Sequence, residues 1–268
     1  MKLTKGQVAV VTGGASGIGR AMALDLARRG LHVVLADVEA GPLARTAEEV
    51  AEHGVSVLPV RTDVSSLQSV QALAQRAFER FESVHVLCNN AGVSVGGPLH
   101  EARHEDWQWV LGVNLWGVIH GVEAFVPRMI AAGQGGHVVN TASMAGLIAS
   151  QNLGIYNTTK YAVVGLSETL AKDLRDTGIG VSVLCPMGVQ TNIRESERNR
   201  PAQFGSRADA RRQPELLGRW IPPEDVAALV MRAIEENRLY IPTHFEGREH
   251  WDRRAQRIHD AFPEPTDA

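Results

Sequence analysis

The stretch VAVVTGGASGIG, residues 8–19, decides the fold of this chain. Its apolar, largely β-branched first half predicts a buried strand, and its glycines run directly into a segment with helical spacing. Glycine is favoured in such a turn because the backbone needs positive φ and because a Cβ would keep a ligand away. A helix N-terminus behind a glycine turn binds a pyrophosphate well. The residues of this turn that we expect to hold a dinucleotide are Gly13, Ser16, Gly17, Ile18 and Gly19.

Strand-like and helix-like segments alternate along the rest of the chain. The predicted strands are 8–11, 32–36, 55–60, 84–88, 137–141, 181–184 and 239–241. The predicted helices are 17–29, 43–53, 66–81, 107–132, 155–177 and 224–236. Most of the strand runs are continuously apolar, so both faces of the sheet are expected to be buried beneath helices. The sequence therefore predicts a doubly wound, parallel α/β sheet.

Two segments fall outside this alternation. Residues 188–219 are rich in Arg and Glu and lack a clear period, so we expect a substrate lid there. The arginine-rich run within it, 194–200, is predicted to be a solvated face of the lid rather than an anion site. Residues 245–268 are predicted to form a C-terminal tail with one amphipathic helix, whose apolar side carries Trp251 and Ile258 together with Ala255.

Composition limits the possible partners. The chain is 44% hydrophobic and 21% charged, which is typical of globular proteins and excludes a disordered or collagen-like chain. A net charge of −3 provides no broad basic field, so nucleic-acid binding is not expected. The apolar run near the N-terminus is too short to span a membrane, and Cys88 and Cys185 are expected to be buried free thiols. We therefore predict a soluble, cytoplasmic protein without a membrane partner.

Polar residues follow the first strands at one edge of the predicted sheet. Asp37 ends the second strand, where a carboxylate can accept both hydroxyls of an adenosine ribose. A 2′-phosphate would meet like charge at Asp37, and Ser16 offers no positive charge to neutralise it, which favours NAD over NADP. Asp63 and the run Asn89-Asn90-Ala91-Gly92 follow the third and fourth strands at the same edge.

Tyr156 and Lys160 are spaced to project from one face of the predicted helix 155–177. Ser143 precedes them, directly after the fifth strand. A nearby cation favours the phenolate, which makes a tyrosine useful as a general acid or base near neutral pH. Taken alone, the pair also fits a half-buried Tyr beside a solvated Lys. The glycine turn and Ser143 favour the catalytic interpretation.

In their order and spacing these motifs resemble the short-chain dehydrogenase/reductase family, in its standard-length NAD(P)-dependent branch. The resemblance covers roughly residues 5–242 and rests on TGGASGIG at 12–19, NNAG at 89–92, Asn114 in VNLWG, Ser143, Tyr156 and Lys160. It implies a single Rossmann-like domain, spanning 1–268, with a seven-stranded parallel sheet and helices on both faces. It also implies hydride transfer between NAD(H) and a carbinol or carbonyl carbon, in a homotetramer or homodimer joined through the helices at Trp107 and Ile155.

The resemblance further implies a role for each matched residue. Tyr156 is the acid/base, Ser143 orients the substrate oxygen, and Lys160 holds the nicotinamide ribose and lowers the pKa of Tyr156. Asn114 supports a water that relays protons through Lys160. The remaining contacts that it implies to NAD are Asp63 and Val64 at the adenine, Asn90 with Ala91 and Gly92 on the adenosine side, and Val189 and Thr191 at the nicotinamide carboxamide.

Two local patterns need separate interpretation. Pro186-Met187-Gly188 stands where the family usually has Pro-Gly, so Met187 either lies beside the nicotinamide or fills the core. The run His100-Glu101-Ala102-Arg103-His104 matches the zinc-protease pattern H-E-x-x-H. Because it lies between a Gly-Gly-Pro turn and an acidic pair, we expect a polar helix entrance there and no metal site.

The substrate pocket is predicted to be apolar. Residues 144–148, 93–99 and Met187 would surround Ser143 without an obvious fixed charge, which favours a bulky apolar secondary alcohol or its ketone. The segments 198–204 and 239–244 are similar to bacterial Cα-dehydrogenases that act on benzylic alcohols of aryl ethers. Two alternatives remain, an NADPH-type carbonyl reductase of acyl or steroid substrates and a redox-inactive dinucleotide-binding regulator. Asp37 opposes the first, and the intact set of Tyr156, Lys160 and Ser143 opposes the second.

Overall fold

One parallel sheet organises the molecule. A computed structural model describes residues 1–206 and 219–263, and the statements below refer to these residues. The strands are β1 (Val8–Thr12), β2 (His32–Asp37), β3 (Val57–Arg61), β4 (Val86–Asn89), β5 (Gly136–Thr141), β6 (Ile179–Cys185) and β7 (Tyr240–Pro242). They lie in the order β3-β2-β1-β4-β5-β6-β7, with every neighbouring pair parallel. The strand order reverses between β1 and β4, where open α/β sheets form a ligand crevice at the carboxyl ends of their strands.

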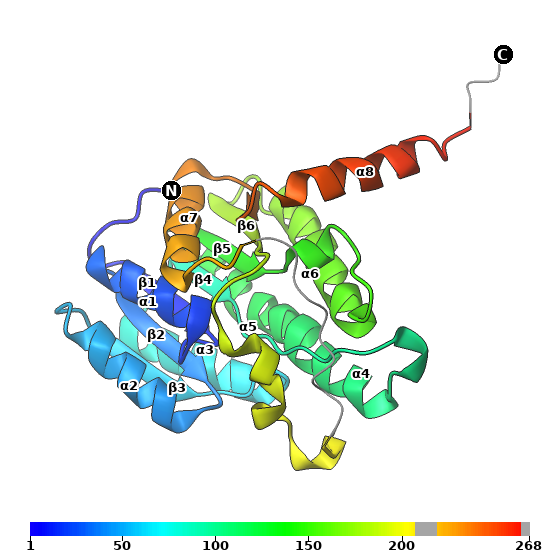
Figure 1. Ribbon diagram of the computed structural model, residues 1–268. Helices are drawn as coiled ribbons and strands as arrows, with labels where there is room; N and C mark the ends of the chain where they lie inside the picture. The colour runs from blue at the N-terminus through cyan, green and yellow to red at the C-terminus, as the bar shows by residue number, and fades with distance from the viewer. Residues whose placement is uncertain (207–218, 264–268) are drawn as a thin grey trace.

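Helices cover both faces of this sheet (Figure 1). They are α1 (Gly17–Arg28), α2 (Ala40–Ala51), α3 (Leu67–Phe81), α4 (His104–Leu111), α5 (Gly117–Ala132), α6 (Gly154–Asp173), α7 (Pro223–Glu236) and α8 (Gly247–His259). Successive strand residues point to opposite faces. Ala9 and Val11 of β1 therefore share a core with α1, α2 and α7, whereas Val8 and Val10 share the other core with α3 and α5. The doubly wound, single-domain fold that the sequence predicts is confirmed.

The predicted helix 107–132 is wrong as one regular helix. The helical stretch begins at His104, and a π-helical turn, η2 (Gly112–Trp116), separates α4 from α5. Such turns occur mostly as single insertions and frequently lie at functional sites. This one carries Asn114, whose side chain is fully buried and bonded to the backbone after β4. Apolar periodicity continues through both halves and does not reveal the turn.

The same stretch, His104–Ala132, is long and apolar enough to cross a membrane by length and composition alone. Half of its most apolar window is buried inside the fold, as in a core helix of a globular protein. Cys88 and Cys185 are free and buried, as the sequence analysis expects.

The C-terminal tail forms the expected helix, α8, which extends away from the sheet (Figure 1). Its predicted apolar side does not pack onto the core, however. Trp251 is 40% exposed and Ile258 is 44% exposed, and Phe245 just before the helix is 81% exposed. The apolar side of α8 is therefore left partly exposed in the single chain.

Candidate active site

The glycine turn after β1 is shaped for close approach. Gly13 and Gly17 have φ of +65° and +53°, which L side chains rarely adopt. A Cβ on Gly13 would lie 2.9 Å from the Cα of Ala91, and one on Gly19 would lie 2.1 Å from the carbonyl oxygen of Gly13. Any side chain at these positions would therefore displace the turn. The free backbone N–H groups at the start of α1 provide the anion-binding end that a pyrophosphate requires.

Asp37 is fixed at the end of β2 by two backbone donors. Its Oδ2 accepts from the N–H of Ala15 at 3.1 Å, and its Oδ1 accepts from the N–H of Glu39 at 3.0 Å. Burial raises the pKa of Asp37 above its ordinary value, although these hydrogen bonds act to lower it. The carboxylate thus lies between the glycine turn and the start of α2, where the sequence analysis expects a ribose.

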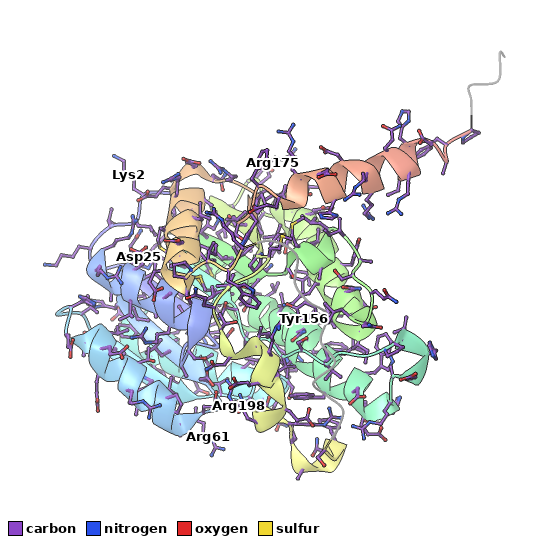
Figure 2. The ribbon with its side chains drawn as sticks, viewed as in Figure 1. Lys2, Asp25, Arg61, Tyr156, Arg175 and Arg198 are labelled. Atoms are coloured by element: carbon purple, nitrogen blue, oxygen red, sulfur yellow. The ribbon has the colours of Figure 1, made fainter. Side chains whose placement is uncertain are left out.

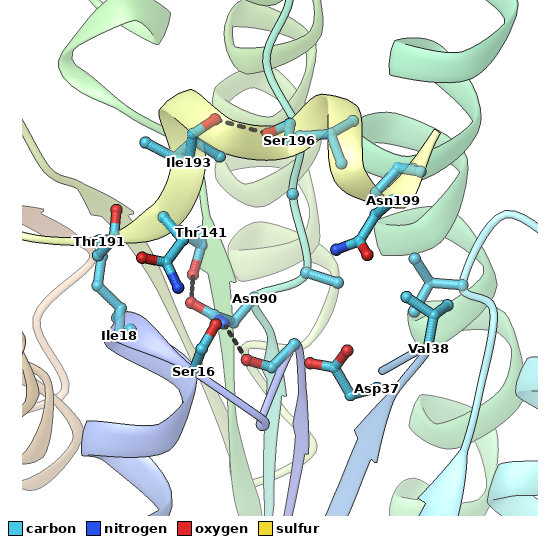
Figure 3. Close-up of a pocket in the computed structure, with 18 of the residues that line it drawn as sticks. Ser16, Ile18, Asp37, Val38, Asn90, Thr141, Thr191, Ile193, Ser196 and Asn199 are labelled. Atoms are coloured by element: carbon cyan, nitrogen blue, oxygen red, sulfur yellow. Dashed lines mark hydrogen bonds between the residues drawn. The ribbon is translucent and has the colours of Figure 1, made fainter. Parts of the chain in front are cut away.

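A first cavity of about 350 Å³ joins these elements along the carboxyl edge of the sheet (Figure 3). Of the residues predicted to bind a dinucleotide, those that line it are Gly13, Ser16, Gly17, Ile18, Asp37, Asp63, Val64, Asn90, Ala91, Gly92, Tyr156, Lys160, Val189 and Thr191. Gly19 lies beneath the turn instead and makes room for it. Asn90 is held by its Nδ2, which donates to Thr12 O at 3.0 Å, and by Thr141, whose hydroxyl donates to Asn90 Oδ1 at 3.3 Å.

A short helix, η4 (Asn192–Asn199), covers this cavity and belongs to the predicted lid (Figure 3). Ser196 anchors η4, because its hydroxyl accepts from the N–H of Ser94 at 3.1 Å. On the outer side, Arg198 pairs with Glu39 at 3.0 Å and bridges the cavity to the start of α2. Figure 2 shows Tyr156 and Arg198, which both line the cavity. Residues 207–218 of the predicted lid lie outside the described residues.

The arginine run 194–200 is solvated only in part: Arg194 and Arg198 are exposed, as the sequence predicts, whereas the Arg200 side chain is buried. Arg200 Nη2 lies 2.6 Å from Asp106 Oδ1, and the two side chains are 2% and 0% exposed. The Arg200 guanidinium also lies 4.9 Å from the ring centroid of Trp109, and it donates to the carbonyl of Phe204 at 3.0 Å. Burial alone would raise the pKa of Asp106, but the hydrogen bonds from Arg103 and Arg200 outweigh it and lower the pKa. Arg200 therefore fastens the lid to α4.

Ser143, Tyr156 and Lys160 come together where the first cavity meets a second one. Ser143 caps the short helix η3 (Met144–Gly146), and its Oγ accepts from the N–H of Ala145 at 3.1 Å. Lys160 Nζ donates to the carbonyl of Thr141 at 2.8 Å and lies 5.4 Å from the ring centroid of Tyr156. Ser143 and Tyr156 border both cavities, whereas Lys160 borders the first.

Burial dominates the electrostatics of this group. It raises the pKa of Tyr156 to about 12, with a side-chain hydrogen bond from Ser143 acting in the opposite direction. Burial also lowers the pKa of Lys160 to about 8, because the ammonium loses its hydration. The family resemblance implies that Lys160 lowers the pKa of Tyr156. In the protein alone the pKa is raised overall, because desolvation of the phenolate dominates. The contribution of Lys160 stays a prediction.

Asn114 supports the site without lining either cavity. Its Oδ1 accepts from the N–H of Val93 at 2.8 Å, and its Nδ2 donates to the carbonyl of Val93 at 2.9 Å. A Cβ on Gly92 would lie 3.5 Å from Asn114 Oδ1 and 3.6 Å from Lys160 Nζ. Asn114 and Lys160 thus flank Gly92. The role of Asn114 in supporting a relay water stays a prediction.

The second cavity has a volume of about 940 Å³. Its inner wall carries several of the apolar residues that the sequence analysis names, including Met144, Ala145, Ile148 and Met187. Met187 borders both cavities and does not fill the core, and Gly188 next to it accepts from the N–H of Ile221 at 3.0 Å. Val93 borders the first cavity, whereas Val95 packs in a core cluster with Trp109 and Ile155.

The outer wall of the second cavity corrects the expectation of a pocket without fixed charge. It is formed by α8, through residues that include His250, Arg253, Arg254 and Arg257. The amphipathic pattern of this helix alone predicts no chemistry for it. The spacing of these residues along the chain, which places them on one helix face, was the available signal.

The H-E-x-x-H pattern does not form one helix. His100 lies in the short helix η1 (Leu99–Glu101), the backbone of Ala102 and Arg103 is extended, and His104 begins α4. The two histidines therefore lack the shared helix face that this metal motif requires. Among residues 1–206 and 219–263, no group of three or more His, Cys, Asp or Glu is arranged to hold a metal ion.

Comparison with known proteins identifies the family. The sequence profile described as short chain dehydrogenase matches residues 7–202, well over half of the chain. The chain belongs to the short chain dehydrogenase family. As a short chain dehydrogenase, it is an oxidoreductase that acts on alcohol groups.

Individual relatives match this short chain dehydrogenase over almost its whole length. It is 34% identical to the C alpha-dehydrogenase of a Sphingobium species, over 97% of this chain and 88% of that protein. It is 37% identical to the 1-deoxy-11-beta-hydroxypentalenate dehydrogenase of Streptomyces exfoliatus, over 90% of this chain and 84% of that protein. A solved short chain dehydrogenase/reductase from Burkholderia phymatum, in complex with NAD, is 44% identical with a TM-score of 0.91, covering 100% of this chain and 99% of that one.

Proposed function

We propose that this short chain dehydrogenase transfers a hydride between NAD(H) and a bulky apolar secondary alcohol or its ketone, with Tyr156 as the general acid and base. One observation carries the proposal. Ser143 and Tyr156 border both the cavity that the glycine turn and Asp37 share and the large second cavity with an apolar inner wall. A hydroxyl held in the second cavity would therefore meet a dinucleotide held in the first.

The residues of the first cavity fit NAD. The glycine turn leaves room for the pyrophosphate at the start of α1, and Asp37 is placed to accept from the hydroxyls of the adenosine ribose. A 2′-phosphate at Asp37 would meet like charge. Arg198 borders the same cavity but is already paired with Glu39. The NAD complex of the Burkholderia phymatum relative supports the same choice.

The chain's own groups supply the proton chemistry, while bound NAD supplies the hydride acceptor. Ser143 orients the alcohol oxygen, and the Tyr156 oxygen accepts the hydroxyl proton as the alcohol is oxidised. With a pKa of about 8, Lys160 stays mostly protonated at neutral pH, so its charge favours the phenolate that this step requires. Because desolvation opposes the phenolate, Tyr156 must first release its own proton before it can accept one from an alcohol. In the reverse direction the protonated Tyr156 donates its proton to the ketone oxygen.

Substrate size and assembly follow from the surfaces around the site. The apolar inner wall of the second cavity favours a hydrocarbon or aryl group, at roughly 25 cal/mol per Å² of apolar surface removed from water. We further propose a cytoplasmic homotetramer or homodimer that binds neither nucleic acid nor membrane. Exposed apolar side chains on the helices beside the site, Trp116 at 51% and Ile130 at 43%, support self-association.

The test is a substrate panel with each cofactor. We expect NAD to be preferred over NADP, and 1-arylalkanols or bulky cyclic alcohols to have a higher kcat/KM than short aliphatic alcohols or small hydroxy acids. Tyr156→Phe should lower kcat by about 10² to 10⁴ while NADH binding stays intact. Tyr240→Phe on β7, whose hydroxyl pairs with Glu168 away from both cavities, is the matched control. Near-normal turnover by Tyr156→Phe, or a small hydroxy acid as the best substrate, would refute the proposal.

A further inference from the structure

We infer that α8 selects, among bulky apolar alcohols, those that carry a carboxylate remote from the reacting hydroxyl. The inference rests on the proposed function, because it names the substrate class of the same site. It assigns a specificity role to a helix that is distant in sequence from Ser143, Tyr156 and Lys160. The observation behind it is that a row of basic side chains on α8 lines the large second cavity.

Three arginines and one histidine of α8 occupy one helix face. His250, Arg253, Arg254 and Arg257 follow the spacing i, i+3, i+4 and i+7, which brings side chains together on a single side. All four border the second cavity. Two acidic residues of the helix, Glu249 and Asp252, do not border it, although their positions alternate with the cationic ones along the sequence. The side of α8 that borders the second cavity is therefore basic, and the acidic residues lie elsewhere on the helix.

Two of these arginines have no carboxylate partner among the described residues and can pair with a ligand. Arg253 forms an ion pair with Glu249, whose carboxylate lies 3.8 Å away. Arg254 and Arg257 form no ion pair with any described carboxylate, and none of the described residues that border the second cavity is Asp or Glu. Cations that line a concave surface without counter-charges raise the local concentration of anions. The outer end of the cavity is thus suited to a carboxylate.

Arg254 is held in place relative to the catalytic helix. Its guanidinium lies 5.3 Å from the ring centroid of Tyr161 and 5.5 Å from that of Trp251. Tyr161 belongs to α6, the helix that also carries Tyr156. At its other end, α8 begins against the apolar wall, because a Cβ on Gly247 would lie 2.7 Å from the Cε of Met144. The cationic face is therefore attached to both the catalytic helix and the inner wall.

The cavity separates the two kinds of recognition. Its inner wall, with Met144, Ile148 and Met187, removes an apolar body from water, whereas the charges lie on the opposite wall. A volume of about 940 Å³ is at the upper end of the range for small-molecule sites, about 300–1,000 Å³. A small hydroxy acid fills little of this space and gains little apolar contact. A large alcohol whose carboxylate lies at the far end uses both walls.

The test compares a matched pair of substrates that differ only in charge. The probes are a biphenyl alcohol whose far ring carries a carboxylate, and the methyl ester of the same compound. Both kcat/KM with NAD and the dissociation constant from calorimetry with NADH-bound protein are measured. We expect the wild-type protein to favour the acid by about tenfold, since an exposed ion pair contributes up to about fivefold and two arginines are available.

Variants assign the preference to α8. Arg254→Gln/Arg257→Gln should abolish the preference for the acid, mainly by raising the KM for the acid. Arg254→Lys/Arg257→Lys should keep most of it, which a purely structural role of these side chains would not predict. Arg248→Gln is the matched control, because Arg248 lies on the same helix, is 73% exposed, pairs with Asp252 and does not border the cavity.

Each outcome decides between the two proposals. If the ester is oxidised and the wild-type protein shows no preference for the acid, the inference is wrong and the proposed function stands. If neither probe is oxidised, the proposed function fails for this substrate class, and calorimetry alone decides the inference. Tighter binding of the acid that depends on Arg254 and Arg257 then supports it, and equal binding of acid and ester overturns it.

Discussion

Replacing Asp106 by Asn should loosen the cover of the first cavity. Asp106 on α4 is the buried counter-charge of Arg200, which belongs to the segment that continues from η4. Asparagine has nearly the same shape, so Asp106→Asn removes the charge without leaving a cavity. Arg200 would then stay buried without its nearest carboxylate, since Glu197 is 3.7 Å away and 31% exposed.

The size of the effect follows from the burial of the pair. With side chains 2% and 0% exposed, the pair belongs to the class in which removal of one partner costs about 3–5 kcal/mol. Arg200 keeps the Phe204 carbonyl and the Trp109 ring, so the lower end, about 3 kcal/mol, is expected. For a domain of this size that corresponds to a fall in Tm of roughly 6–12 °C. Weaker NADH binding should accompany it, because η4 covers the first cavity.

Urea unfolding and calorimetric NADH titration measure both effects. Arg103→Gln is the control, because it touches the same carboxylate from a side chain that is 40% exposed and should cost no more than about 1 kcal/mol. Asp106→Leu/Arg200→Met should recover most of the lost stability, since both charges are replaced by apolar groups. The reasoning fails if Asp106→Asn unfolds within about 1 kcal/mol of the wild-type protein.

Two further predictions concern charge at other positions. Asp37→Ala should weaken NAD binding and raise the kcat/KM ratio of NADP to NAD, because the like charge that opposes a 2′-phosphate is removed; an unchanged ratio in steady-state kinetics would contradict this. Burial lowers the pKa of His137 to about 3, while in the unfolded chain it is about 6.5, so the unfolded state alone binds a proton between these values. The contribution of neutral His137 to stability is therefore complete above pH 6.5. It is lost as the pH falls toward 3, by about 1.4 kcal/mol per pH unit. The unfolding free energy of His137→Gln should therefore depend less steeply on pH in that window than that of the wild-type protein.

Local signals in the sequence were enough to predict the sheet and the centre of the site. Each strand is a short run of apolar residues. The glycines indicate a turn whose backbone adopts conformations that only glycine adopts easily. Tyr156 and Lys160 share a helix, so their spacing alone sets their relative placement. These features depend on neighbours within a few residues, which is why the sequence reveals them.

Features that depend on distant contacts were missed. Arg200 and Asp106 are 94 positions apart, so the sequence could show a charged lid but not its buried counter-charge. The pKa of Tyr156 depends on how completely the fold removes water from it, which the spacing to Lys160 does not encode. The cationic face of α8 was visible as a periodic pattern, but its meaning depends on the cavity that α6 and η3 build beside it.

The ion pair between Arg198 and Glu39 has a kinetic consequence. It joins η4 to the start of α2, and both residues line the first cavity, so we expect the contact to slow the release of a dinucleotide. Both side chains are partly exposed, at 33% and 23%, and charges in such positions are screened over about 8 Å at physiological ionic strength. Added salt should therefore speed the escape of the reduced cofactor. Where that escape limits turnover, the enzyme should run faster in salt, because salt weakens the attraction between Arg198 and Glu39.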